Sequence, residues 1–300
     1  MRKRARCGLL LILASVWAGP LPAAVTPAEN VLAFSRDLRD QTKLRHVLYL
    51  RPRADSVAPR AAYVLLPYRG GESDNMADLV GAAQLVRDHD IWVIIPEAVN
   101  GYWNYKMLLG AASVPDDVKF LSRVIDEAVA AYGLDARRIY MGGYSGGAMM
   151  TIRYACERPE KIAGAALVGG QLIRTLAPRC STAAPVPMAF VNGELDPVGA
   201  YNGDATLMSS PDSAAFWAQL NGCDALPVHE QLPDTVNDGT RIELDRYGGC
   251  RQGQAVRLYT VRQGGHTWPG AVDFSPSLGR TSQDLNASEA FIRFLLSFSR

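Results

Sequence analysis

The strongest structural signal in this chain is the sequence Ile139-Tyr140-Met141-Gly142-Gly143-Tyr144-Ser145-Gly146-Gly147. An apolar, strand-like run ends in a glycine-rich turn with Ser145 at its tip, and a helical run over 146–156 starts directly after it. In this strand–turn–helix order, G-x-S-x-G is typical of a nucleophile elbow, a strained turn that exposes a serine hydroxyl. Glycines are needed around the serine because a side chain there would collide with the neighbouring strand or helix. The alternative interpretation is a glycine-rich turn with an incidental serine.

Strand-like and helical segments alternate on both sides of this turn. Apolar runs with β-branched residues predict strands that are buried on both faces, at 64–66, 91–95, 139–141, 163–168, 187–191 and 255–261. Helical spacing predicts helices at 76–86, 118–129, 146–156, 213–220 and 287–298. This alternation implies a mostly parallel central sheet with helices on both faces, a three-layer α/β sandwich. We expect one catalytic domain over 25–300, with irregular loops at 201–211 and 226–239.

Composition and charge exclude several classes of protein. The chain has 300 residues, of which 48% are hydrophobic and 20% charged, so it is globular rather than disordered. Residues 1–24 hold four basic residues and no acid, which leaves 27 basic against 30 acidic residues in the remainder. A mildly acidic body offers no broad basic surface, so we expect neither nucleic acid nor anionic lipid as a partner. No apolar stretch is long enough to span a membrane.

The first 24 residues have the pattern of a secretory signal peptide. A basic start (Arg2, Lys3, Arg4 and Arg6) precedes a short apolar run over 8–18, and small residues follow at Ala23-Ala24. We place cleavage near Ala24 and expect a secreted or periplasmic protein. The alternative is a membrane anchor, for which the apolar run is too short. Cys7 precedes the apolar run, so the lipoprotein pattern is absent.

Four cysteines remain after such cleavage, and an even number in an exported chain favours disulfides. Of the three connectivities we favour Cys156–Cys180 and Cys223–Cys250, the pairs that are neighbours in the sequence. Cys223 follows a predicted helix and Cys250 lies in a turn between two strand-like runs, so their bond would join a helix to a hairpin. The chain has no Cys-x-x-Cys or His-Glu-x-x-His motif, so we predict no metal site and no cofactor.

A serine hydroxyl needs a base, and the base needs an acid that orients it. In folds with this elbow the order along the chain is Ser, then Asp or Glu, then His. Two of the four histidines, His46 and His89, precede Ser145, and His229 lies in a polar stretch. We therefore predict His266, in a glycine-rich loop after the 255–261 strand, as the base. Asp196, which follows the 187–191 strand, is the predicted acid, with Glu194 as the second candidate.

Several motifs resemble the exported α/β-hydrolases that include polyhydroxybutyrate depolymerases and feruloyl esterases. The resemblance runs from about residue 45 to the end of the chain. Its motifs are Asp116-Asp117-Val118, the elbow followed by Ala148-Met149-Met150, Ala155-Cys156-Glu157-Arg158-Pro159, Gly193-x-x-Asp196-Pro197, Asn221-Gly222-Cys223 and Gly265-His266-Thr267-Trp268-Pro269-Gly270. It implies the α/β-hydrolase fold, a Ser145–His266–Asp196 triad, no cofactor, and hydrolysis of carboxylic esters through an acyl-enzyme. The implied substrates are hydroxyalkanoate oligomers or polyesters, or feruloyl-type esters.

The chain departs from this family after its first central strand. The family has a His-Gly-Gly-like segment there that supplies half of the oxyanion hole, whereas this chain has Leu66-Pro67-Tyr68-Arg69-Gly70-Gly71. We expect one donor from the Gly146 N–H and the second from the backbone of Arg69 or the hydroxyl of Tyr68. Trp103 and Trp268, in loops at the same sheet edge, are candidate apolar walls for the substrate.

Two other hypotheses about function stay open on the sequence alone. The same triad could act on an amide or on a carboxylate-rich polymer, because both routes acylate the serine. The altered oxyanion segment also allows a hydrolase-fold protein that binds a ligand without catalysis.

Overall fold

The computed structural model describes residues 30–40, 43–106, 115–180, 184–272 and 275–300. The predicted signal peptide (1–24) and Cys7 lie outside the described residues. No helix in the described ranges is both long and apolar enough to cross a membrane.

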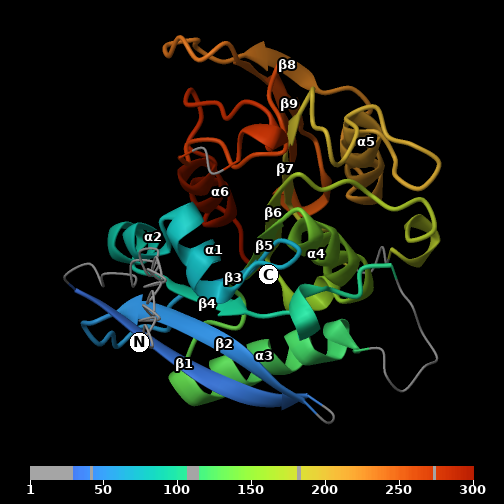
Figure 1. Ribbon diagram of the computed structural model, residues 1–300. Helices are drawn as coiled ribbons and strands as arrows, with labels where there is room; N and C mark the ends of the chain where they lie inside the picture. The colour runs from blue at the N-terminus through green and yellow to red at the C-terminus, as the bar shows by residue number, and fades with distance from the viewer. Residues whose placement is uncertain (1–29, 41–42, 107–114, 181–183, 273–274) are drawn as a thin grey trace, which may run out of the picture.

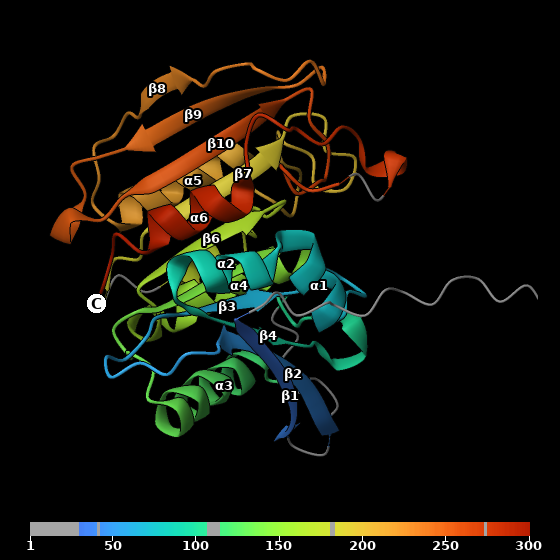
Figure 2. The same cartoon turned by 90° about the vertical axis from the view of Figure 1, so that its left-hand side faces the viewer.

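All the strands described belong to a 10-stranded sheet with the order β1-β2-β4-β3-β5-β6-β7-β10-β9-β8 (Figures 1 and 2). The six central strands, from β4 to β10 in this order, are parallel, and the antiparallel pairs lie toward the two edges. The strands are β1 (Val31–Asp40), β2 (Lys43–Pro52), β3 (Ala62–Leu66), β4 (Trp92–Pro96), β5 (Ile139–Tyr144), β6 (Gly164–Val168), β7 (Met188–Gly193), β8 (Val228–Gln231), β9 (Arg241–Tyr247) and β10 (Val256–Arg262).

Helices cover both faces of the sheet, which gives the expected three layers. One face packs against α1 (Ser73–Val80), α2 (Ala82–His89) and α6 (Ala287–Leu295). The other face packs against α3 (Asp117–Tyr132), α4 (Gly146–Glu157) and α5 (Ser210–Leu220). Because the parallel strands are apolar on both sides, each of the two interfaces forms its own hydrophobic cluster.

The structure corrects two of the predicted segments. The helix predicted over 76–86 is two helices, because Gly81 adopts a left-handed conformation (φ 64°) that ends α1 and starts α2. Residues 226–239, predicted as an irregular loop, contain the edge strand β8, which pairs antiparallel with β9. The other predicted strands and helices are present, with ends shifted by a few residues.

Both favoured cysteine pairs are joined in the structure. Cys156, near the end of α4, is bonded to Cys180. Cys223, just after α5, is bonded to Cys250, in the connection between β9 and β10. The second bond therefore joins a helix to a hairpin, as the sequence suggested.

The topology determines where functional residues can meet. Parallel strands have their carboxyl ends at one edge of the sheet, and ligands of open α/β sheets bind outside that edge. The loops after β3, β4, β5, β6, β7 and β10 all start there. These loops contain the elbow serine, the predicted acid and the predicted base.

Candidate active site

Ser145 lies in a strained turn between β5 and α4. Its backbone has φ 54° and ψ −116°, a conformation that non-glycine residues rarely adopt, and its N–H donates to the Val168 carbonyl at 2.9 Å. The flanking glycines are required by close packing. A Cβ on Gly147 would lie 2.1 Å from the Leu66 carbonyl oxygen of β3, and a Cβ on Gly143 would lie 2.5 Å from the Gly147 backbone. The turn is therefore an elbow that presents the half-buried serine at the sheet edge.

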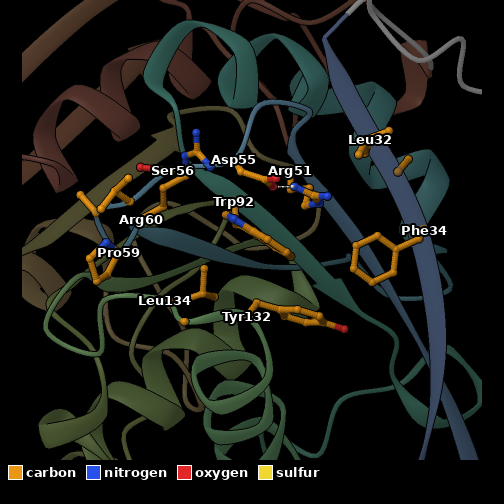
Figure 3. A pocket seen from close by; sticks show the side chains of 14 residues that line it. Leu32, Phe34, Arg51, Asp55, Ser56, Pro59, Arg60, Trp92, Tyr132 and Leu134 are labelled. Carbon is orange, nitrogen blue, oxygen red and sulfur yellow. Dashed lines mark hydrogen bonds and ion pairs between the residues drawn. The ribbon is translucent and has the colours of Figure 1, made fainter.

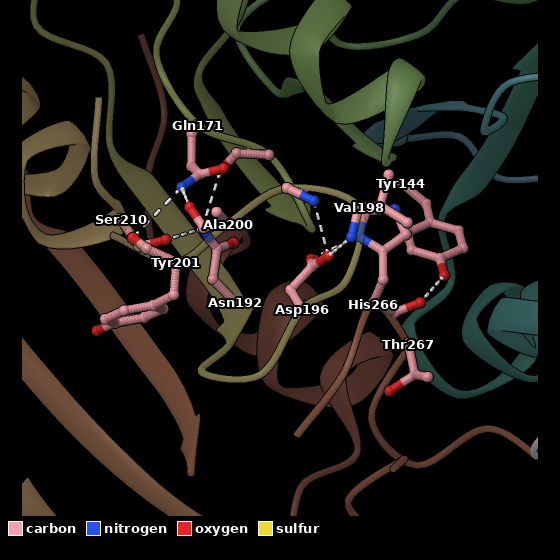
Figure 4. Close-up of polar contacts among 12 residues, drawn as sticks. Tyr144, Gln171, Asn192, Asp196, Val198, Ala200, Tyr201, Ser210, His266 and Thr267 are labelled. Atoms are coloured by element: carbon pink, nitrogen blue, oxygen red, sulfur yellow. Dashed lines mark hydrogen bonds and ion pairs between the residues drawn. The ribbon is translucent and has the colours of Figure 1, made fainter. Parts of the chain in front are cut away.

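His266 and Asp196 form a buried hydrogen-bonded pair (Figure 4). The distance between His266 Nδ1 and Asp196 Oδ2 is 2.5 Å. The other carboxylate oxygen of Asp196 accepts from the backbone N–H groups of Val198 at 2.7 Å and Gly199 at 2.8 Å. One oxygen of Asp196 thus accepts two hydrogen bonds from the backbone, and the other oxygen is bonded to the imidazole.

The remaining ring nitrogen of His266 is free for chemistry. Nε2 is buried and has no hydrogen-bond partner among the described residues. His266 and Ser145 line the same cavity, which has a volume of about 250 Å³. An unpaired buried nitrogen is costly in a folded protein and is commonly found where a substrate or a proton transfer needs it. The unpaired nitrogen therefore belongs to a side chain that lines the same cavity as the serine.

The second candidates for acid and base are engaged elsewhere. One Glu194 oxygen pairs with Arg262 at 2.7 Å and the other accepts from the Gln263 N–H at 3.2 Å. His229 lies on the exposed edge strand β8, where its Nδ1 is 2.8 Å from Asp245. Neither Glu194 nor His229 lines the cavity that is lined by both Ser145 and His266.

Most of the cavity walls were not identified from the sequence. Apolar and polar side chains from α4 and from the loops after β4, β6 and β7 together form the walls of the cavity. The lining residues besides Ser145, Gly146 and His266 are Tyr105, Lys106, Met149, Gly169, Gln171, Ile173, Val198, Gly199, Asp204, Thr206 and Leu207. Met149 lies in α4, and the other residues lie in loops without periodic patterns, so no local signal marks those loop residues as cavity walls.

Two backbone amides lie next to the serine. Gly146 lines the cavity at the start of α4, and an ideal Cβ on Gly146 would lie 3.4 Å from the Arg69 nitrogen. Neither N–H donates to an acceptor within the described ranges. Neither Tyr68 nor Arg69 is among the residues that line the cavity, and the Tyr68 ring packs edge-on against Tyr144 at 5.5 Å. Because its nitrogen lies beside Gly146, the Arg69 amide is the candidate that we carry forward as the second oxyanion donor.

The structure corrects the prediction that two tryptophans form substrate walls. Trp103 is 5% exposed and Trp268 is 2% exposed, and neither lines the cavity. Trp268 packs edge-on between Tyr144 and Phe291, and its indole N–H donates to Ser288 Oγ at 3.0 Å.

Trp103 instead supports the segment that carries Arg69. Its indole N–H donates to the Pro67 carbonyl at 2.9 Å. The Gly70 N–H donates to the Gly101 carbonyl at 2.8 Å. The loop after β4 is thus bonded to the loop after β3 on both sides of Arg69.

A larger cavity lies away from these residues (Figure 3). It has a volume of about 920 Å³ and is lined by residues at the amino ends of β3 and β4, by β1 and by the end of α3. Its aromatic side chains contact one another: Trp92 stacks on Tyr132 at 4.8 Å, and Phe34 packs edge-on against both. It contains no serine–histidine pair, so the smaller cavity is the better candidate for catalysis.

Sequence comparison relates the chain to esterases. Residues 107–207 match a family model described as phospholipase/carboxylesterase. The chain is 30% identical over 200 residues to a protein of Nocardia uniformis subsp. tsuyamanensis named esterase NocK, covering 61% of this chain and 58% of that protein. It is 30% identical over 162 residues to feruloyl esterase B of Piromyces equi, covering 50% of this chain and 29% of that protein. The match thus spans less than two thirds of either relative.

Solved structures share the fold. An acetyl xylan esterase from Aspergillus awamori superposes with a TM-score of 0.61 and 18% identity, over 79% of this chain and 94% of that chain. A thermostable esterase superposes with a TM-score of 0.55 and 17% identity, over 90% of this chain and 64% of that chain. The chain therefore has the fold of these solved esterases, the α/β-hydrolase fold, and the sequence relatives that it matches in part are named esterases, feruloyl esterases among them.

Proposed function

We propose that this protein is an exported serine esterase that hydrolyses carboxylic esters through a Ser145–His266–Asp196 triad. The observation that carries the proposal is the state of His266. One ring nitrogen is bonded to a buried carboxylate, the other is buried and unpaired, and the residue lines the same cavity as the elbow serine. The arrangement fits the division of work in a serine hydrolase: nucleophile, base and orienting acid.

Each residue has a definite part in the reaction. Ser145 Oγ attacks the ester carbonyl carbon while His266 Nε2 takes the hydroxyl proton. Asp196 accepts from Nδ1–H and stabilises the imidazolium that forms. The imidazolium then protonates the leaving alcohol as the acyl-enzyme forms. A water molecule, deprotonated by the same nitrogen, then attacks the acyl carbon. The bond from this carbon to Ser145 Oγ breaks, Oγ takes the proton from His266 Nε2, and the acid leaves.

The charge that develops on the carbonyl oxygen needs donors that are already in place. We assign this role to the N–H groups of Gly146 and Arg69. The first lies at the N-terminus of α4, where the helix dipole also favours negative charge. The second is held in place by the bonds of Trp103 and Gly70 to the neighbouring loop.

Two findings bear on substrate and location. Relatives named feruloyl esterases favour a feruloyl-type ester over a hydroxyalkanoate, and a cavity of about 250 Å³ is large enough for a single aryl-acyl group. Two disulfides favour an oxidising compartment. We therefore place the protein outside the cytoplasm and rank feruloyl-type esters first, ahead of hydroxybutyrate oligomers.

A fluorophosphonate probe and an ester panel test the proposal. We expect the wild type to be labelled on Ser145, to hydrolyse p-nitrophenyl esters, and to prefer methyl ferulate to hydroxybutyrate oligomers. Ser145→Ala abolishes the labelling. A folded wild type that stays unlabelled and inactive would support the binding-protein hypothesis instead, and turnover of amides alone would assign the triad to another substrate.

Removing the Arg69 N–H should slow the reaction strongly. Arg69→Pro deletes this donor and is expected to lower kcat by about 10²- to 10³-fold, the cost of losing one oxyanion donor. Arg69→Ala keeps the amide and removes only the guanidinium, which is bonded to the Tyr102 hydroxyl. It should stay within about threefold of the wild type. Equal kcat values for the two variants, measured with a p-nitrophenyl ester, would exclude this amide as a donor.

A further inference from the structure

Tyr144, the residue before the nucleophile, makes two separate contacts with His266. Its hydroxyl donates to the His266 backbone carbonyl at 2.5 Å. Its ring lies 5.3 Å from the imidazole, with an angle of 29° between the two planes. Figure 4 shows the hydroxyl of Tyr144 directed at the main chain of His266, beside the imidazole that Asp196 holds. One side chain thus contacts both the backbone and the ring of the candidate base.

The Tyr144 side chain is itself rigidly held. It is 1% exposed, and its ring packs edge-on against Trp268 at 6.1 Å and against Tyr68 at 5.5 Å. Burial and the nearby Asp196 raise the pKa of its phenol well above the usual value, so the hydroxyl keeps its proton and stays a donor. The contacts with His266 are therefore made by a group with little freedom to move.

The backbone of Gly169, which follows β6, also lies against the imidazole. A Cβ on Gly169 would lie 2.7 Å from His266 Cε1 and 3.0 Å from Nδ1. The absence of a side chain at this position lets the ring lie directly against the backbone. The imidazole is thus packed closely by both the Tyr144 ring and the Gly169 backbone.

A single hydrogen bond from Nδ1 to Asp196 fixes one atom of the ring but leaves the ring free to turn about that bond. A contact with the ring's face restricts this rotation, and a bond to the backbone carbonyl fixes the base of the side chain. Both restrictions come from the residue that is covalently joined to Ser145. Position and orientation of Nε2 relative to the nucleophile are therefore set by one rigid segment, which is the requirement for efficient proton transfer.

We propose that Tyr144 is a positioning residue that fixes His266 relative to Ser145 through its ring contact and its hydroxyl bond to the His266 carbonyl. The proposal rests on the proposed function, since it concerns the base of that same reaction. Tyr144 does not line the cavity, so its effect is on proton transfer rather than on substrate binding.

The chain offers a matched control for the test. Tyr140 lies on the same face of β5, is fully buried, and its hydroxyl donates to the Phe298 carbonyl at 2.6 Å. Tyr144→Phe and Tyr140→Phe each remove one phenol–carbonyl bond, buried for Tyr144 and partly buried for Tyr140, and Tyr140→Phe also removes a bond with Arg138, so both variants should have a lower Tm than the wild type. Only Tyr144→Phe should lower kcat, by about 10- to 100-fold, the scale of a misplacement of about 1 Å. KM should stay within about twofold for both.

A spectroscopic measurement separates this proposal from the proposed function. The proton shared by His266 Nδ1 and Asp196 gives a low-field proton NMR signal, assigned by its loss in His266→Ala. We expect the signal to shift or broaden by exchange in Tyr144→Phe and to be unchanged in Tyr140→Phe. An unchanged signal in Tyr144→Phe, or equal losses of kcat in the two variants, would overturn the positioning role. Turnover in the wild type that does not depend on Ser145 would instead overturn the proposed function.

Discussion

Ser145→Ala and His266→Ala are each expected to lower kcat for a carboxylic ester by up to about 10⁶-fold. The serine variant has no nucleophile, and the histidine variant has no group that can take the serine proton. The double variant should be no slower than either single variant, because the residues of a triad act as one unit. What activity remains in all three comes from substrate binding and the oxyanion donors.

The measurement is steady-state hydrolysis of a p-nitrophenyl ester by the three variants and two controls. Ser35→Ala removes an exposed serine on β1, and His229→Ala removes the exposed histidine on β8. Both controls should keep kcat within about twofold of the wild type. Losses that multiply in the double variant would show that Ser145 and His266 act independently, which contradicts a shared proton transfer.

The parallel core of the fold was predictable because its strands are continuous apolar runs. Residues such as Val64, Ile94 and Leu167 are buried on strands that are covered on both faces. The continuous apolar run therefore identifies each strand without knowledge of the neighbouring strands. The β1–β2 hairpin was not predicted. The strand β1 has one exposed face, and charged residues such as Arg36, Asp37 and Arg39 interrupt its apolar pattern. Its strand structure depends on pairing with β2.

The chemistry of the candidate site was more predictable than its walls. Ser145, Asp196 and His266 each follow a strand in a local motif, and the chain order limits the choice of base and acid. The two tryptophans had no such constraint. The buried Trp103 ring is held by a hydrogen bond to the Pro67 carbonyl, 36 positions earlier in the chain, and the local sequence does not show such a contact. The hydrogen bond from Tyr144 to His266, 122 positions later, is hidden from the local sequence for the same reason.

Asp196→Asn is expected to lower kcat by about 10⁴-fold, through the wrong tautomer of the base. The reason lies in the bonds of the carboxylate. One oxygen accepts from the N–H groups of Val198 and Gly199, so an asparagine would keep its carbonyl oxygen there and turn its NH₂ group toward His266. An NH₂ donor requires Nδ1 to be the acceptor. The imidazole proton then moves to Nε2, which can no longer take a proton from Ser145.

Glu194→Gln is the matched control for this variant. It makes the same change from carboxylate to amide two residues away, where the side chain pairs with Arg262 rather than with the imidazole. It should stay within about threefold of the wild type in kcat. Because a tautomer defect leaves the fold unchanged, Asp196→Asn should unfold at a Tm close to that of the wild type. If Glu194→Gln is the slow variant and Asp196→Asn keeps its activity, the orienting acid is Glu194, and the 2.5 Å contact between Asp196 and His266 is structural only.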